Sequence, residues 1–307
     1  MSRGTPGLQM VPMHPSVPVT PVVDAVSASS EKVAGYRIHR LLARGGMAHV
    51  YLAERESDGG TCVLKLLPIS EHDGGHLVQR LINEAALLSQ ITNPCVAQIL
   101  DHGFTEWHAY IAMEYLPGGD LRTLLDAPVT PDRAVEMLIQ LAGALDAVHG
   151  AGIVHCDVKP DNVLRRADGT LAIVDFGIAR KLGMDLSRSG PGNLVGTASY
   201  IAPERLSGGV ADHRSDLYAL GVLFHEMLTG RKPYVSGDPV KLLQMHRDAP
   251  LPQLPGDVAW AQKLLERLLA KHPDDRFQSA AELIEAVLDV VSALQHHTVA
   301  TDAVATA

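Results

Sequence analysis

The stretch from residue 153 to residue 177 concentrates polar side chains that could handle a phosphate group and a metal ion. Its sequence, IVHCDVKPDNVLRRADGTLAIVDFG, holds two carboxylates, Asp157 and Asp175, with Lys159 and Asn162 between them. Carboxylate and amide oxygens suit Mg²⁺, which proteins usually hold through one or two carboxylates together with substrate phosphates. A lysine ammonium suits a phosphoryl group as a point charge. These residue types therefore indicate metal-assisted phosphoryl chemistry.

A β-hairpin is the element that must bring these groups together. Two short apolar runs, VLR and LAIVD, are joined by the turn residues Asp168 and Gly169, a pattern typical of two strands and a tight turn. Because a hairpin returns the chain on itself, we expect Asp175 to lie near Asp157 and Asn162. Either aspartate alone would fit a hairpin with a solvated charged rim, but the spacing of both together favours a site.

A second candidate element is the run TCVLKLLPI, residues 61 to 69, which predicts a strand that carries one lysine, Lys65. A charge among apolar strand residues needs a partner, because burying an unpaired charge is costly. Glu84 is the candidate partner, since it lies on the amphipathic segment HLVQRLINEAALLSQI. A solvent-exposed pair of little energetic value is the alternative interpretation.

Upstream of this strand, residues 36 to 54 form two β-prone runs around a turn of small residues, YRIHRLLARGGMAHVYLAE. A hairpin tip without bulky side chains lets backbone N–H groups approach phosphates. An ordinary hairpin would show the same pattern. The position of this turn before the lysine strand and the polar stretch favours a phosphate-facing loop.

The pattern H-x-D-x-K-P-x-N followed by D-F-G resembles the catalytic and metal loops of the protein kinases, specifically their Ser/Thr branch, and the G-G-M turn is similar to that of bacterial Hanks-type members. The resemblance covers about residues 36 to 293. It implies an α+β, bilobal protein-kinase fold: a small antiparallel β-sheet lobe with one helix, and a larger, mainly helical lobe. It also implies ATP with Mg²⁺ between the lobes, and γ-phosphoryl transfer to Ser or Thr hydroxyls of proteins, with autophosphorylation.

The resemblance assigns catalytic roles to four matching positions. Asp157 would accept the proton of the substrate hydroxyl and orient that hydroxyl. Lys159 would neutralise charge on the transferring γ-phosphoryl group. Lys65 would hold the α- and β-phosphates of ATP while an ion pair with Glu84 steadies it.

The same resemblance implies ligands for the metal and for the nucleotide. Asn162 and Asp175 would hold the metal ions. The positions implied in nucleotide binding are Leu42, Ala43, Gly45, Val50, Val63, Lys65, Met113, Glu114, Leu116, Asp120 and Leu164.

The chain departs from the family pattern in two places. Ala43 and Ala48 stand where the glycine-rich loop has its first and third glycines, and Cys156 stands where most regulated kinases carry arginine. That arginine grips a phosphorylated residue of the activation segment through charge-assisted hydrogen bonds, which cysteine cannot make. We therefore expect that activity does not strictly require phosphorylation of the segment at Ser187 or Ser189.

Structural roles are implied for several further residues. Asp216 would brace the backbone of the catalytic loop, and Glu204 would pair with Arg276. The sequence also predicts a helix that begins after the cap Thr130. The residues that match the apolar stack joining the two lobes of active kinases are Leu88, Ile99, His155 and Phe176.

The composition of the chain argues against some classes of protein and some kinds of partner. The chain has 307 residues, 46% of them hydrophobic, and a formal net charge of −9, which argues against nucleic acid or an anionic membrane as the main partner. Its three cysteines, Cys62, Cys95 and Cys156, are far apart and show neither zinc spacing nor a disulfide framework, so a cytoplasmic location fits best. No apolar run is long enough to cross a bilayer, so no membrane partner is expected.

The sequence predicts four segments. Residues 1–34, rich in Pro, Val, Ser and Thr, read as a disordered tail, residues 35–116 as the small lobe, residues 117–295 as the large lobe, and residues 296–307 as a disordered C-terminal tail.

Two alternatives from other functional classes remain open at this level. A pseudokinase, a nucleotide-binding scaffold without turnover, would fit Ala43, Ala48 and Cys156. A small-molecule phosphotransferase would share the aspartate-loop chemistry, but the activation segment ending in Ala-Pro-Glu at residues 202–204 argues against it. The substrates and the regulator are not specified by the residues.

Overall fold

The computed structural model describes residues 32–44, 48–69, 76–126, 129–176, 198–207 and 211–305, all within one compact unit that begins at Lys32. Gly45, Ser187, Ser189 and nearly all of the predicted N-terminal tail lie outside the described residues. Val33, which lies before the predicted boundary at residue 35, is buried and forms a β-bridge with Tyr36.

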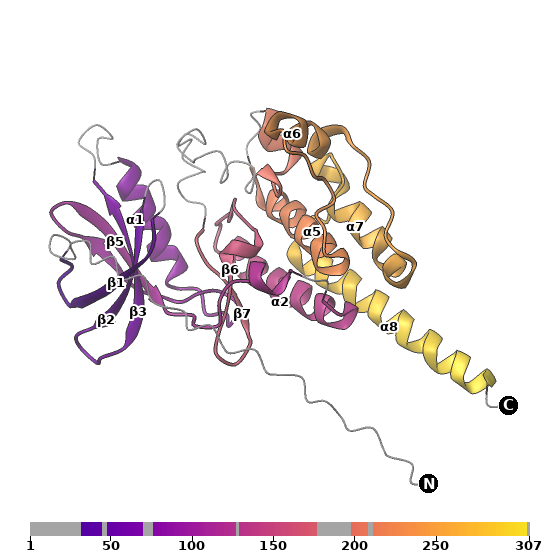
Figure 1. The fold of residues 1–307 in the computed structure, drawn as a ribbon, viewed down its shortest axis with the longest axis horizontal. Helices are drawn as coiled ribbons and strands as arrows, with labels where there is room; N and C mark the ends of the chain where they lie inside the picture. The colour runs from indigo at the N-terminus through magenta and orange to yellow at the C-terminus, as the bar shows by residue number, and fades with distance from the viewer. Residues whose placement is uncertain are drawn as a thin grey trace, which may run out of the picture. The chain divides into compact units, whose positions relative to one another are not determined.

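The small lobe is a five-stranded antiparallel sheet covered by one helix (Figure 1). The strand order is β1-β2-β3-β5-β4, and the helix is α1, His76–Leu88. The strands are β1 Tyr36–Arg44, β2 His49–Arg55, β3 Thr61–Pro68, β4 Ile99–Phe104 and β5 His108–Glu114. The predicted small antiparallel sheet with one helix is confirmed.

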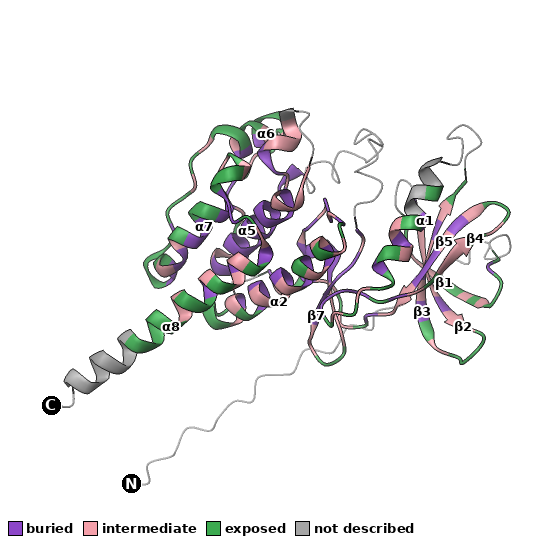
Figure 2. Cartoon of the chain, turned by 180° about the vertical axis from the view of Figure 1, so that it is seen from behind, coloured by how far each residue is buried: buried purple, intermediate pink, exposed green. Residues whose placement is uncertain are grey.

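The large lobe is mainly helical, as the sequence predicts. Its helices are α2 Pro131–Gly150, α5 His213–Thr229, α6 Pro239–Asp248, α7 Gln262–Leu268 and α8 Ala280–Ala305. The two-stranded hairpin β6 Val163–Arg165 and β7 Leu171–Ile173 completes it. Helix α5 is the centre of this lobe, because every residue from Ser215 to Leu228 is buried (Figure 2).

Local sequence signals set the ends of these helices. Thr130 caps α2, where its side chain accepts a hydrogen bond from the Arg133 N–H at 3.4 Å and Pro131 takes the first helical position. Asp212 caps α5 in the same way. Gly230 ends α5 at φ +68°, a left-handed conformation that glycine adopts without steric cost.

One apolar cluster joins the two lobes. It contains Leu88 of α1, Ile99 of β4 and Phe176, together with most of the large-lobe core. The ring centroids of Phe176 and His155 lie 4.8 Å apart. The four side chains expected to form an inter-lobe stack are therefore all buried at this junction.

The last helix differs from its prediction. The sequence predicts a disordered tail from residue 296, whereas α8 continues to Ala305. The extension contains neither glycine nor proline, and a helix already started adds each further turn at little cost. Among the described residues, no helix has both the length and the apolar character that crossing a bilayer requires.

Candidate active site

The β6–β7 hairpin places Asp175 beside Asn162, as the turn at residues 168 and 169 predicts. Val163 pairs with Ile173 in this hairpin, and the Val174 N–H then donates to the Asn162 carbonyl at 2.9 Å. Asp175 follows with φ +55°, a conformation that residues other than glycine rarely adopt. Such strain is often found at functional sites.

Asp157 is held by two polar neighbours on its own loop. Its Oδ2 accepts hydrogen bonds from Lys159 Nζ at 2.9 Å and from Asn162 Nδ2 at 2.9 Å. The Asn162 amide also donates to the Asp157 carbonyl at 2.8 Å. Both the backbone and the carboxylate of Asp157 are therefore fixed relative to the lysine that follows it.

An ion pair links the two lobes at this loop. Lys65 Nζ of β3 lies 2.6 Å from Asp175 Oδ1, although 110 positions separate the residues. The Lys65 charge lowers the pKa of Asp175 and outweighs the burial that acts in the opposite direction. Asp175 is therefore ionised at neutral pH.

Glu84, the predicted partner of Lys65, lies half-buried on α1. The ion pair that the structure gives for Lys65 is with Asp175, so the pair with Glu84 stays a prediction. The resemblance implies that Lys65 and Asp175 share one inter-lobe cleft, and the structure brings them together. The direct ion pair between them was not predicted, because no local pattern reports a pairing between two lobes.

The register of the sheet places the predicted nucleotide-binding side chains on one face. Val50 and Ile111 are the cross-strand partners of Lys65, and Met113 is the partner of Val63. Directly opposed residues in an antiparallel sheet point to the same side. The intervening β3 residues Cys62, Leu64 and Leu66 are buried on the other face.

The first strand adds two more predicted positions to this part of the sheet. Ala43 of β1 pairs with Val50 of β2. Leu42 lies at the irregularity between the pairs formed by Leu41 and Ala43, and it is half-buried. Gly45, at the tip between the two strands, lies outside the described residues.

The connection between the lobes brings Leu116 and Leu164 together. Both belong to one apolar cluster, and Asp120 forms a β-bridge with Leu164. The Glu114 N–H donates to the Gln98 carbonyl at 3.0 Å, so this N–H is not available to a ligand.

Two arginines of the hairpin reinforce this connection, and the sequence gives no signal for either. Arg166 forms an ion pair with the Glu114 carboxylate. Arg165 donates two hydrogen bonds to the Gly118 carbonyl, at 3.0 and 2.6 Å. A Cβ atom at Gly118 would lie 2.7 Å from the Arg165 carbonyl oxygen, so the close approach requires glycine.

Asp216 braces the catalytic loop, as expected. Its carboxylate accepts the backbone N–H groups of His155 and Cys156, both at 2.8 Å. It also bonds His149 Nε2 at 2.9 Å. A buried carboxylate with several donors is well satisfied, so this part of the loop is held by the helix at the centre of the lobe.

His155 acts as a neutral connector. Its Nε2 faces the Val174 carbonyl at 3.0 Å, and its Nδ1 faces the Asp157 N–H at 3.2 Å. Since a carbonyl can only accept and an N–H can only donate, Nε2 carries the proton. Burial lowers the pKa of His155, which favours the same neutral form.

The donor set at Asn162 and Asp175 fits a magnesium ion. The Asn162 amide nitrogen is directed to Asp157, which leaves its oxygen as the ligating atom, and only one oxygen of Asp175 bonds Lys65. Oxygen donors suit Mg²⁺, which retains water and phosphate ligands. Within the described residues no cluster of three or more His, Cys, Asp or Glu could hold a metal.

Comparison with known proteins agrees with this geometry. Residues 36–288 match the family model "Protein kinase domain". Serine/threonine-protein kinase PknD of Mycobacterium tuberculosis is 37% identical over 281 residues, which cover 89% of this chain and 42% of PknD. PknH of Mycobacterium bovis is 37% identical over 84% of this chain and 44% of its own length.

A relative from another genus has a similar level of identity. Serine/threonine-protein kinase pkn2 of Myxococcus xanthus is 38% identical over 279 residues, 86% of this chain and 33% of pkn2. This chain thus spans less than half the length of these curated relatives. The match over residues 36–288, together with the Asp157 loop and the Lys65–Asp175 pair, shows that the chain belongs to the protein kinase family.

Proposed function

We propose that this chain is an ATP-dependent Ser/Thr protein kinase that transfers the γ-phosphoryl group to protein hydroxyls, its own included, in a signalling pathway. The observation that carries the proposal is the 2.6 Å ion pair between Lys65 of the small lobe and Asp175 of the large lobe. It brings together an ammonium group suited to phosphates and a carboxylate suited to a metal ion, one from each lobe, which supports the proposal. The printed names of the relatives, all serine/threonine-protein kinases, support the same activity.

The nucleotide would lie against the face of the sheet that carries Val50, Val63 and Met113. Apolar side chains on this face suit the adenine ring, and Leu164 would cover it from the large lobe. The triphosphate would then extend toward Lys65, where the ammonium group meets the α- and β-phosphates. Asp120, at the bridge to Leu164, is the polar group proposed for the ribose.

Asp157 would act on the attacking hydroxyl. The hydroxyl oxygen bonds to the γ-phosphorus and gives its proton to the Asp157 carboxylate. The bond from the γ-phosphorus to the β,γ-bridging oxygen breaks, and ADP leaves with that electron pair. Because Asn162 and Lys159 hold Oδ2 of Asp157, the carboxylate needs little reorganisation.

Two cations, one from the chain and one a metal ion, would balance the negative charge of this step. Lys159 Nζ, 2.9 Å from Asp157, would attract the oxygens of the transferring group. Mg²⁺, when bound, neutralises charge on the triphosphate, and Asn162 and Asp175 would hold it. Each group then stabilises charge where it develops.

The nucleotide-binding scaffold is the rival that the departures at Ala43, Ala48 and Cys156 favour. It would bind ATP without turnover. The test is transfer of γ-labelled phosphate from Mg-ATP to the chain and to a generic basic protein, followed by identification of the labelled amino acids. We expect phosphoserine or phosphothreonine from the wild type.

The matched control is Asp157→Asn, which keeps the size of the side chain and removes the base. General-base catalysis contributes on the order of a hundredfold to ten-thousandfold, so this variant should give almost no label. A wild type that binds ATP yet labels nothing would establish the scaffold instead.

A further inference from the structure

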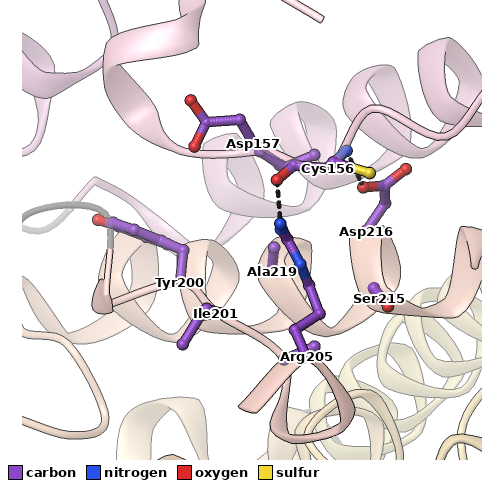
Figure 3. Close-up of a pocket in the computed structure, with 10 residues that line it drawn as sticks. Cys156, Asp157, Tyr200, Ile201, Arg205, Ser215, Asp216 and Ala219 are labelled. Carbon is purple, nitrogen blue, oxygen red and sulfur yellow. Dashed lines mark hydrogen bonds between the residues drawn. The ribbon is translucent and has the colours of Figure 1, made fainter. Parts of the chain in front are cut away.

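Arg205 makes a contact with the catalytic loop that none of the assigned roles includes. It lies in the 3₁₀ turn Pro203–Ser207, directly after the Ala-Pro-Glu sequence that ends the activation segment. Its Nη1 donates to the Cys156 carbonyl oxygen at 2.6 Å. Figure 3 shows the side chain reaching across the pocket to this oxygen.

The carbonyl in question belongs to the peptide unit that leads into Asp157. Cys156 has φ +65°, a left-handed conformation that a non-glycine residue keeps only when its surroundings impose it. Asp216 accepts the Cys156 N–H at 2.8 Å, and Arg205 binds the carbonyl of the same residue. The two charged side chains therefore hold the strained residue from its two ends.

The turn that carries Arg205 is itself held rigidly by hydrogen bonds. The preceding residue, Glu204, accepts hydrogen bonds from Arg276 at 2.9 and 2.7 Å and from Ser215 Oγ at 2.6 Å. Arg276 is 1% exposed and also donates to the carbonyls of Ala270 and Arg214. A guanidinium that extends from such a rigid turn can set the position of the group that it binds.

We propose that Arg205 is a positioning residue for Asp157. Its charge-assisted hydrogen bond to the Cys156 carbonyl fixes the peptide that precedes the base. In this chain a guanidinium from the C-terminal end of the activation segment thus contacts the catalytic loop without any phosphorylation, at the residue where cysteine replaces arginine. The inference rests on the proposed function, since it assigns the base role to Asp157.

The test compares Arg205→Met with Arg205→Lys in the full chain. Methionine keeps the aliphatic bulk but cannot donate, whereas lysine keeps the charge and one donor. We measure kcat and KM for Mg-ATP, kcat and KM for a protein substrate, the dissociation constant of Mg-ATP, and the thermal midpoint. Arg247→Met is the matched control, because Arg247 forms an exposed pair with its neighbour Asp248.

We expect Arg205→Met to lower kcat by about tenfold to a hundredfold, because small displacements of a catalytic group cost this much. The dissociation constant of Mg-ATP and the thermal midpoint should match those of Arg247→Met. Arg205→Lys should recover most of the lost kcat. This separation of kcat from ATP binding, with rescue by lysine, is not expected of a residue that only supports the fold.

A kcat for Arg205→Met within about twofold of the Arg247→Met value would overturn the inference, since positioning effects are larger. The inference would also be overturned if the kcat of both Arg205 variants fell only in proportion to the fraction of protein that is folded. If the wild type and Arg205→Met are both fully active while Asp157→Asn is inactive, the proposed function stands and only the role of Arg205 is refuted. A silent wild type overturns the proposed function and this role together.

Discussion

The Lys65–Asp175 pair should matter more for catalysis than for the free energy of unfolding. The pair is partly buried, with side chains 23% and 41% exposed. Enough water still reaches the two charges to screen their attraction, so the pair contributes little to the free energy of unfolding. The geometry instead holds an ammonium group between the two lobes, beside the Asp175 carboxylate, where a triphosphate would meet it. The consequence of losing Lys65 should therefore appear in catalysis.

We predict that Lys65→Met lowers kcat/KM for Mg-ATP by on the order of a hundredfold or more, because a charge aimed at the phosphates stabilises the transition state. The thermal midpoint should change by only about 2 °C, because Asp175 is 41% exposed and water can solvate its carboxylate once Lys65 is replaced. Steady-state kinetics and a thermal melt check both parts. Lys263→Met, at an exposed position of α7, is the control, and equal kcat/KM values for the two variants would contradict the prediction.

The activation segment is the element for which the departure at Cys156 has consequences. A phosphate on this segment would find no arginine at position 156, while the loop is already held by Asp216 and Arg205. Both contacts are present in the unmodified chain. We therefore expect that the catalytic loop does not need a phosphate on this segment to be held in place.

We predict that replacing Ser187 and Ser189 together by alanine leaves kcat within about threefold of the wild-type value, since no charge-assisted contact from cysteine is lost. The measurement is kcat for a protein substrate, with the phosphorylation state of each sample determined by mass spectrometry. A loss above tenfold would show that these serines switch the enzyme on.

The Glu204–Arg276 bridge is the element-scale contact on which the large lobe depends. The Arg276 side chain is 0% exposed and its guanidinium lies 4.9 Å from the Tyr218 ring centroid. Removing one partner of such a pair leaves the other charge buried without compensation. The same loss would release the turn that carries Arg205.

We predict that Arg276→Met lowers the free energy of unfolding by about 3–5 kcal/mol. Arg247→Met, at an exposed pair, should cost no more than about 1 kcal/mol. Urea denaturation of both variants gives the comparison. Similar losses in the two variants would contradict the structural role of the bridge.

At the scale of the whole molecule, buried histidines make stability depend on pH. Burial lowers the pKa values of His155 and His225, and burial together with the Lys271 charge lowers that of His246 to about 4. In the unfolded chain each histidine has its ordinary pKa near 6.5. Below pH 6.5 the unfolded state thus binds more protons than the folded state, so stability falls as pH decreases.

We predict that the free energy of unfolding decreases between pH 6.5 and pH 5 by up to about 1.4 kcal/mol per pH unit for each of the three histidines. Urea midpoints at several pH values measure the slope. His246→Gln removes one titrating group and should therefore make the slope smaller. Stability that stays constant or rises as the pH falls through this range would contradict the assignment.

The sequence predicts most of the local architecture, because local signals determine it. Thr130 caps a helix, the turn at Gly169 makes the hairpin, and a short β-prone apolar run predicts the strand of Lys65. The continuation of α8 to Ala305 and the burial of Val33 were not predicted. Neither the alanine-rich sequence at the end of α8 nor the valine-containing sequence around Val33 carries a signal that marks where a structural element stops or starts.

Local sequence patterns did not predict the contacts between elements that are distant in the chain. Arg205 and Cys156 are 49 positions apart, and Lys65 and Asp175 are 110 positions apart. Such pairs depend on how the lobes and the segment fold onto each other, which hydrophobic periodicity does not encode. The family resemblance supplied the Asp216 brace and the Glu204–Arg276 bridge, but it gave no indication of the Arg205 contact.

The central claim is that Lys65 and Asp175 meet at the place where a metal-bound triphosphate sits. Calorimetric titration of ATP with and without Mg²⁺ tests it most directly, in the wild type, in Asp175→Asn and in Asp157→Asn. We predict that Mg²⁺ tightens ATP binding in the wild type and in Asp157→Asn, and that Asp175→Asn binds ATP but loses most of this Mg²⁺ dependence. An Asp175→Asn variant with the full wild-type response to Mg²⁺ would contradict the claim.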